Sequence, residues 1–384
     1  MKRTRRQKGY VYKKGNLWLV RYYDNQVLPD GTIHRVQKAH KLVEATGDYR
    51  SRKEARVLAD EFLAPLNDGR ATPQSSMTLT RFVEENYLPF VQTHKRISTF
   101  HGYRNMWKGY LKPHGEIALR DFRTADGERA LEAIARASDL TSTTLQHIKA
   151  FMSGVFRYAK RQGVINSENP MRDVVIPKAK TAGDTYAYSL EEILQMLNIL
   201  SEPAATVVAA ASFTGARKGE VRGFRWEDYD GEQIRISRSY WRGHALEPKT
   251  KKSKAPVPVI AQLAERLNLH RLLSGNPGAG LMFPSPGGKP INLDALARAV
   301  IRPALEAQGL RWYGWHAFRR GLATNLHRLR VQDEIIQRIL RHSSVSVTQA
   351  CYIKTADADV VAAMRSLENA PSMHLEGVKK RQLM

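Results

Sequence analysis

Residues 340–354 are the most informative stretch of this chain and read Leu-Arg-His-Ser-Ser-Val-Ser-Val-Thr-Gln-Ala-Cys-Tyr-Ile-Lys. His342 stands ten residues before Tyr352. Taken alone, Tyr352 is one of fifteen tyrosines and would by default be a packing residue. The stretch indicates a function only in combination with basic residues further upstream in the sequence.

Two upstream stretches each join a basic residue to a partner on one side of a helix. They are Ser-Phe-Thr-Gly-Ala-Arg-Lys-Gly-Glu at residues 212–220 and Trp-His-Ala-Phe-Arg-Arg at residues 315–320. Positions i and i+3 of a helix are neighbours, so we expect Glu220 to orient Arg217. For the same reason, His316 and Arg319 are expected to share a face. Either pair, taken alone, is more simply an ordinary surface contact.

A lysine-rich stretch lies between these two. Residues 247–254 hold four lysines in eight positions and lead into the strand-like residues 256–259. One interpretation is a solvated hairpin tip. The other is a hairpin that delivers one ammonium group to a phosphate, with Lys249 as the candidate and Lys251 and Lys252 as rivals. Lys251 and Lys252 are also candidate DNA contacts.

The composition indicates a polyanionic partner. The 384 residues include 61 Lys and Arg against 37 Asp and Glu, a formal net charge of +24. Such an excess favours nucleic acid or an anionic membrane. The longest nearly apolar run, residues 204–213, is far below the ~18 residues of a spanning helix, and no signal-peptide pattern opens the chain. The single cysteine excludes an internal disulfide and suits a reducing compartment. We therefore expect an intracellular protein that binds DNA or RNA and no membrane.

The first 68 residues are predicted to form a small α+β module. Short strand-like segments at residues 10–12, 17–23 and 32–38 are separated by turn signals, and a helix should start at Arg52 behind a Ser51/Glu54 capping box. The basic residues expected to contact DNA lie in the N-terminal arm and on the outer sheet face. They are Arg3, Arg5 and Arg6 in the arm, and Arg21, Arg35 and Lys38 on the sheet.

Two further domains are predicted after polar linkers. Residues 77–176 show helical periodicity and are expected to form an all-α bundle, with Lys95 and Arg96 among its basic edges as candidate DNA contacts. Its clearest helix spans residues 143–162. Residues 185–384 are expected to form a mixed, mainly α domain with a small β-sheet and a C-terminal tail. The fold class is thus multidomain.

The order of these residues along the chain resembles the pattern of the tyrosine recombinases, the phage integrase family. That order is Arg, Lys, His-x-x-Arg, His and Tyr. Two flanking sequence motifs also match this family, Thr-Gly-Ala-Arg-x-Gly-Glu and Leu-Arg-His-Ser-Ser-Val-Ser-Val-Thr. The resemblance covers the C-terminal half closely. It extends more loosely to the bundle, which is similar to a core-binding domain, and to the N-terminal module, which is similar to an arm-binding domain. One departure is Phe318-Arg319-Arg320 in place of the commoner Leu-Arg-His, which keeps Arg319.

The resemblance implies a site-specific recombinase, the integrase of a phage or integrative element, that cuts and rejoins DNA through a 3′-phosphotyrosine and a Holliday junction. Tyr352 would be the nucleophile, Arg217 and Arg319 would bind the phosphate oxygens, and Lys249 would protonate the leaving 5′ oxygen. His316 and His342 would assist, Glu220 would support, and no metal or other cofactor is needed. The implied partners are double-stranded DNA with core and arm sites, three further protomers, a host DNA-bending protein and an excisionase. The implied location is the bacterial cytoplasm.

Two alternatives stay open at this point. A type IB topoisomerase would use a similar cationic set, although the N-terminal module disfavours it. A DNA-binding regulator without catalytic activity could keep the same fold. Metal-dependent cleavage would need converging carboxylates, and the acid-rich residues 227–230 are better explained as a solvated turn.

Overall fold

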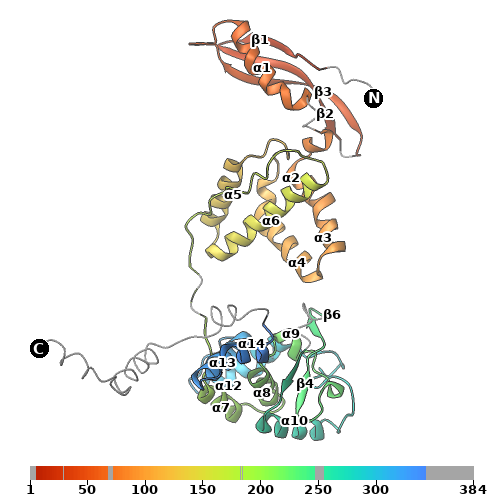
Figure 1. Cartoon of the computed structure of the whole chain (residues 1–384), viewed down its shortest axis with the longest axis vertical. Helices are drawn as coiled ribbons and strands as arrows, with labels where there is room; N and C mark the ends of the chain where they lie inside the picture. Colours follow the sequence, from red (N-terminus) through yellow and green to blue (C-terminus); the bar gives the residue numbers. More distant parts are fainter. Residues whose placement is uncertain are drawn as a thin grey trace, which may run out of the picture. The chain divides into compact units, whose positions relative to one another are not determined.

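The computed structural model of the chain describes residues 6–28, 30–67, 72–181, 183, 185–246 and 255–342. The chain divides into two compact units, Met1–Gly183 (unit 1) and Asp184–Met384 (unit 2), and each is described by itself (Figure 1). Within the described ranges, no helix combines the length and apolar character needed to cross a membrane.

Unit 1 begins with a three-stranded antiparallel sheet in the order β1-β2-β3. Its elements are β1 (Tyr10–Lys14), β2 (Leu17–Val27), β3 (Ile33–Glu44) and the following helix α1 (Arg52–Asn67). One face of the sheet packs on α1, where Val11 and Trp18 share a core with Ala59 and Leu63. The predicted strands and helix are confirmed, and the strands run further than predicted.

Side-chain alternation places Lys38 on the opposite face from Arg21 and Arg35. Lys38 pairs with Tyr22 of β2, whose side chain is buried on the inner face. Residues three apart in a strand point to opposite sides, so Arg35 and Lys38 cannot share a face. The prediction that Lys38 lies on the outer face was therefore wrong. Its Nζ instead donates to Asp24 at 3.0 Å.

Asp24 connects the sheet to the helices that follow it. Its carboxylate is only 2% exposed and accepts hydrogen bonds from Lys38 and from both terminal nitrogens of Arg120. Burial alone would raise the pKa of Asp24, but these hydrogen bonds and positive charges outweigh it and lower the pKa. The backbone oxygen of Val27, at the end of β2, also accepts from Arg81 at 3.0 Å. The sheet is thus attached to the bundle by buried polar contacts.

Replacing Asp24 with asparagine should destabilise unit 1 by about 3–5 kcal/mol, because Arg120 would be left half-buried without its counter-charge. The folded-state pKa lies below the unfolded value of about 3.9, so this stabilisation is present above that pH and is lost as the pH falls through the folded-state value. Hydrogen exchange of β2 and β3 amides in the full chain measures the effect. The exposed Asp48→Asn is the matched control, and equal exchange in the two variants would contradict the prediction.

The rest of unit 1 is a helical bundle. Its elements are η1 (Pro73–Ser76), α2 (Leu79–Phe82), η2 (Val83–Tyr87), α3 (Leu88–His94), α4 (Ile97–Met106), η3 (Trp107–Leu111), η4 (Lys112–His114), α5 (Thr124–Ala137) and α6 (Ser142–Arg161). α6 starts behind Thr141, whose hydroxyl accepts from the Thr144 N–H. Its buried side chains recur every three or four residues from Leu145 to Ala159, as predicted for this helix.

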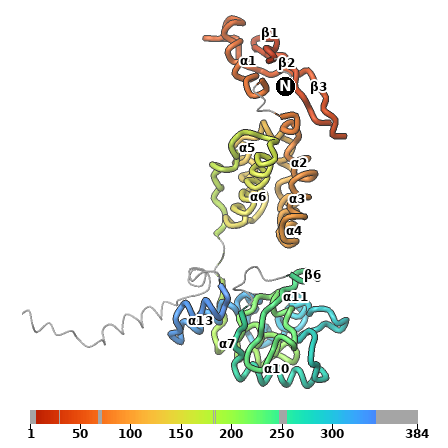
Figure 2. The backbone as a smooth tube through the Cα atoms, turned by 45° about the vertical axis from the view of Figure 1, so that its right-hand side comes forward, coloured from red at the N-terminus to blue at the C-terminus, as the bar shows by residue number. Residues whose placement is uncertain are grey.

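Unit 2 is mostly helical. Its elements are α7 (Leu190–Ile199), α8 (Ala204–Thr214), α9 (Lys218–Val221), η5 (Trp226–Asp228), β4 (Gln233–Arg235), β5 (Ser239–Trp241), β6 (His244–Leu246), β7 (Pro256–Pro258), α10 (Ala261–Leu273), α11 (Leu293–Leu296), η7 (Ala297–Ile301), α12 (Arg302–Glu306), α13 (Trp315–Arg328) and α14 (Asp333–Leu340). The backbone can be followed in Figure 2 from α7 in green to α13 in blue. The predicted small sheet is two separate two-stranded sheets, β4 with β7 and β5 with β6.

α8 is the central helix of unit 2. It is apolar nearly all round and buried at every position except Phe213, because α7, α10 and α13 all pack against it. Its C-terminal end therefore lies in the interior, next to residues that the sequence singled out. The architecture is a small N-terminal antiparallel sheet followed by mostly helical structure. The further division of unit 1 into separate domains at residues 68 and 77 stays a prediction.

Candidate active site

The first part of the candidate site lies where α8 ends and α9 begins. Gly215 ends α8 with a φ of 60°, a conformation that favours glycine. Arg217 directly precedes α9; its Nη1 donates to Glu220 Oε1 at 3.0 Å and its backbone N–H donates to Glu220 Oε2 at 2.8 Å. The predicted Arg217–Glu220 contact is confirmed. Glu220 is buried, whereas 40% of the Arg217 side chain is exposed, so the guanidinium can also meet a ligand.

The second part comes from α13. His316 lies in its first turn, and Arg319 follows one turn later with a fully buried side chain. The Nη1 of Arg319 donates to the backbone oxygen of Gly215 at 2.5 Å, and its Nη2 donates to that of Leu340. Because Gly215 ends α8 and Leu340 ends α14, this guanidinium joins the ends of two helices.

The third part follows α14. Leu340 is its last residue, Arg341 adopts a left-handed conformation, and His342 is only 2% exposed. Both backbone polar groups of His342 are bonded to Gln337. The side-chain Nε2 of Gln337 donates to the His342 backbone oxygen at 3.1 Å, and the backbone oxygen of Gln337 accepts from the His342 N–H at 3.0 Å. The nitrogen Nη2 of Arg341 donates to Glu220 Oε2 at 2.9 Å. Sequence reasoning missed Arg341, which appeared only as the residue before His342.

Positive charge governs the electrostatics of this cluster. Burial would raise the pKa of Glu220, but Arg341, Arg217 and Arg319 outweigh it and lower the pKa. Desolvation together with neighbouring guanidiniums lowers the pKa of His316 to about 4 and that of His342 to about 3. Both imidazoles are therefore neutral near pH 7. An anion placed among these groups would raise both pKa values.

The structure thus brings five of the sequence-predicted residues into one electrostatic cluster. They are Arg217, Glu220, His316, Arg319 and His342. Guanidiniums and imidazoles in this arrangement offer hydrogen-bond donors and positive charge to a tetrahedral anion. The predictions for Lys249, Lys251, Lys252 and Tyr352 fall outside the described residues. The lysine stretch joins β6 to β7 in the sequence.

Apart from Lys38, the predicted DNA-contacting residues of unit 1 that the structure describes are all exposed. They are Arg6, Arg21, Arg35, Lys95 and Arg96, whereas Arg3 and Arg5 lie outside the described residues. On the sheet, the Arg21 guanidinium lies 5.1 Å from the Tyr12 ring centroid and that of Arg35 lies 4.5 Å from the Tyr23 centroid. Sequence reasoning missed these tyrosines, although the alternation of β2 places Tyr23 on the same face as Arg21.

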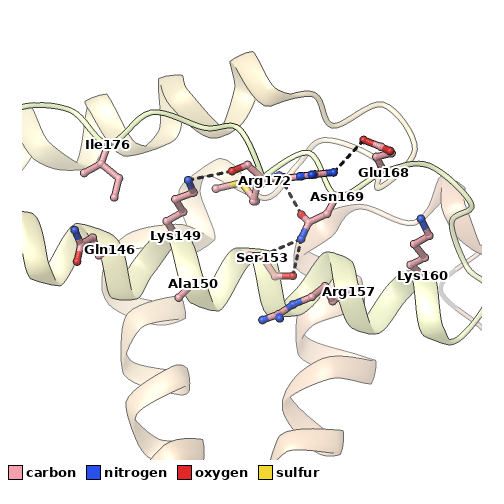
Figure 3. A pocket seen from close by; sticks show the side chains of 11 residues that line it. Gln146, Lys149, Ala150, Ser153, Arg157, Lys160, Glu168, Asn169, Arg172 and Ile176 are labelled. Atoms are coloured by element: carbon pink, nitrogen blue, oxygen red, sulfur yellow. Dashed lines mark hydrogen bonds and ion pairs between the residues drawn. The ribbon is translucent and has the colours of Figure 1, made fainter. Parts of the chain in front are cut away.

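A groove on the helical bundle carries further basic side chains. It runs along α6 and faces residues 168–176 (Figure 3). Two of its polar residues stabilise the bundle itself: Lys149 donates to the Val174 backbone oxygen at 2.6 Å, and Asn169 donates to Ser153 Oγ at 2.8 Å. Arg157 and Lys160 line the same groove and are exposed.

The acid-rich turn at residues 227–230 has its carboxylates engaged in separate contacts. Glu227 pairs with Arg225 at 2.7 Å, Asp228 pairs with Arg238 at 3.2 Å, and Asp230 accepts backbone N–H groups of its own turn. The described residues include no group of three or more His, Cys, Asp or Glu suited to hold a metal ion. These contacts fit the interpretation of residues 227–230 as a solvated turn.

Comparisons with known proteins place this cluster in a family. The model of the phage integrase family matches residues 185–359, which include Arg217, His316, Arg319, His342 and Tyr352. The integrase/recombinase y4gC of Sinorhizobium fredii is 31% identical over 156 residues, which is 38% of this chain and 74% of that protein. The chain belongs to the phage integrase family. It is therefore a tyrosine-type site-specific recombinase, and the topoisomerase and regulator alternatives are not favoured.

Other members of the phage integrase family match over most of the chain. The tyrosine recombinase XerC-like protein of Caldanaerobacter subterraneus subsp. tengcongensis is 23% identical over 364 residues, covering 86% of this chain and 92% of that one. The Tn1549 transposon integrase in complex with circular intermediate DNA has a TM-score of 0.61 at 17% identity, covering 76% of this chain and 100% of that one. The lambda integrase tetramer bound to a Holliday junction has a TM-score of 0.57 at 18% identity, covering 92% of this chain and 99% of that one. At these identities, the solved structures show a shared fold.

Proposed function

We propose that this recombinase is the integrase of a phage or integrative element, and that it cuts DNA by attack of the Tyr352 phenol oxygen on a backbone phosphorus. The observation that carries the proposal is the cluster of three arginines, Arg217, Arg319 and Arg341, around the buried carboxylate of Glu220, with two histidines beside these arginines. The positive charges of the arginines in this cluster exceed the single negative charge of Glu220. A scissile phosphate would supply the further negative charge.

The proposed chemistry is a transesterification. The bond between phosphorus and the 5′ oxygen breaks as the tyrosine–phosphorus bond forms, so the bond energy is kept for rejoining. Arg217 and Arg319 would stabilise the charge that builds up on the non-bridging oxygens. His316, neutral near pH 7, can accept the phenol proton, and His342 would donate a hydrogen bond to the phosphate. Lys249 would protonate the leaving oxygen, with Lys251 and Lys252 as its rivals.

Glu220 has a supporting role in this scheme. Its two oxygens hold Arg217 through both the side chain and the backbone N–H. The orientation of Arg217 is thereby fixed before DNA binds, which reduces the cost of arranging the site during the reaction. No proposed role requires a metal ion.

The three-domain assignment belongs to the same proposal. Residues 1–68 would bind arm sites through the outer sheet face, where Arg21 and Arg35 lie over tyrosine rings. Residues 77–176 would bind core sites, and the exposed Arg157 and Lys160 of the α6 groove are candidate phosphate contacts. Residues 185–384 would be catalytic. Four protomers would act on two duplexes, since a lambda integrase tetramer bound to a Holliday junction shares this fold.

A nicked suicide substrate tests the proposal. Duplexes that bind the protein are first selected from a random pool to define a core site, and a nick beside the scissile phosphate then prevents religation. We expect the wild-type chain to form a covalent protein–DNA complex, and peptide mapping should place the DNA on the peptide that holds Tyr352. Absence of a covalent complex on every bound duplex, or attachment to a different residue, would refute the proposed function.

A further inference from the structure

Arg341 has an unusual backbone conformation for a buried residue. Its φ of 57° and ψ of 44° lie in the left-handed region, which costs a non-glycine residue about 1–2 kcal/mol. The other non-glycine residues with positive φ in the described part of the chain are Arg242, Asn276 and Arg330, and all three are exposed. Arg341 is 3% exposed. A strained backbone and a buried charge at one position need a compensating interaction.

The compensating interaction is with Glu220. The nitrogen Nη2 of Arg341 donates to Glu220 Oε2 at 2.9 Å, and this same oxygen accepts from the backbone N–H of Arg217 at 2.8 Å. The other oxygen, Oε1, accepts from Arg217 Nη1 at 3.0 Å. One buried carboxylate is therefore shared between two arginines, of which Arg217 is partly exposed and Arg341 is not.

The rest of the Arg341 guanidinium is buried without a partner among the described residues. Its Nε and Nη1 are shielded from solvent and make no hydrogen bond there. Burial lowers the pKa of Arg341, although the charge of Glu220 opposes this effect. A guanidinium held under these conditions contributes little to stability beyond its ion pair. Its position directly before His342 points to a role in the site.

We propose that Arg341 is a positioning residue, which fixes the Glu220 carboxylate and through it presents Arg217 to the scissile phosphate. The inference rests on the proposed function. Three charged groups act on Glu220 from three elements: Arg217 at the start of α9, Arg319 from α13 and Arg341 after α14. Arg319 acts on Glu220 through its charge, while its Nη1 and Nη2 each donate to a backbone oxygen, of Gly215 and of Leu340. Arg341 donates a hydrogen bond directly to the Glu220 carboxylate, independently of Arg217.

Removal of Arg341 has a consequence for the pH dependence of cleavage. Glu220 would lose one of the charges that keep it ionised, so its pKa would rise toward or above its usual value. As the pH falls, Glu220 would become protonated at a higher pH than in the wild type, and Arg217 would lose its charged partner. The acidic limb of the cleavage rate against pH should therefore shift to higher pH.

The test compares Arg341→Gly with Arg330→Gly on the nicked suicide substrate, at saturating protein and across a pH series. Both substitutions remove an arginine side chain from a left-handed position, but Arg330 is exposed and lies two residues after the end of α13. We expect Arg341→Gly to cleave about tenfold or more slowly with a shifted acidic limb and unchanged DNA affinity. Arg330→Gly should match the wild type, and Arg341→Lys should recover part of the rate because it keeps the charge.

A double-mutant cycle separates positioning from folding. In a Glu220→Gln background, loss of Arg341 should have little further effect on the cleavage rate, because the carboxylate through which it acts is gone. The inference is overturned if Arg341→Gly keeps the wild-type rate and pH profile, or if its effect adds fully to that of Glu220→Gln. If Arg341→Gly does not fold, the same two readouts are taken on Arg341→Lys. Absence of a covalent complex with the wild-type chain would refute the proposed function instead.

Discussion

The Tyr352→Phe variant should form no covalent complex on the suicide substrate, while it binds the same duplex as tightly as the wild type. The substitution removes one oxygen and keeps the ring, so it deletes the proposed nucleophile with little change in shape. Attack by water could not replace the tyrosine in this assay, because only a DNA strand linked covalently to the protein is counted as product. The loss should therefore be complete within detection, the largest effect predicted for any single substitution in this chain.

Two measurements make this result specific. A gel-shift titration shows that DNA binding persists, and Tyr110→Phe, a substitution in the helical bundle, controls for the loss of a phenol oxygen elsewhere. A free tyrosine has a pKa of about 10, so under the proposed mechanism cationic neighbours or a base would have to favour the phenolate near neutral pH. A covalent band that survives in Tyr352→Phe would assign the nucleophile to another residue.

The local parts of the site could be predicted from the sequence because their partners are close along the chain. Glu220 lies three residues after Arg217, and His316 lies in the same first turns of a helix as Arg319. Helical geometry alone places such residues together. The same is true of the buried face of α6, which follows helical periodicity.

The assembled site could not be predicted by such arguments, because its decisive contacts join distant segments. Arg319 donates to Gly215, 104 residues away, and Arg341 donates to Glu220, 121 residues away. These contacts depend on how α8, α13 and α14 pack together. In the sheet, the error for Lys38 has a local cause: Lys38 and Arg35 are three residues apart, and β-strand alternation separates them. Strand periodicity applied position by position would have avoided it.

Substitution of Arg319 by lysine should lower the cleavage rate by about 10²- to 10³-fold, the loss typical of removing one preorganised donor to a developing negative charge. Lysine keeps the positive charge, but a single ammonium cannot both replace the two terminal nitrogens that donate to Gly215 and Leu340 and donate to the phosphate oxygens. At least one buried carbonyl would then lack its donor, at a cost of about 1–3 kcal/mol in stability. The ends of α8 and α14 would also be held less firmly, and His342 follows directly after α14.

The comparison that isolates this effect is Arg328→Lys, at the exposed end of the same helix. Thermal unfolding of both variants gives the stability change, and cleavage is then measured below both transitions at saturating DNA. We expect Arg328→Lys to behave as the wild type in both assays. If Arg319→Lys cleaved within a few-fold of the wild type, charge alone would suffice at this position, and the forked geometry of Arg319 would have no part in the reaction.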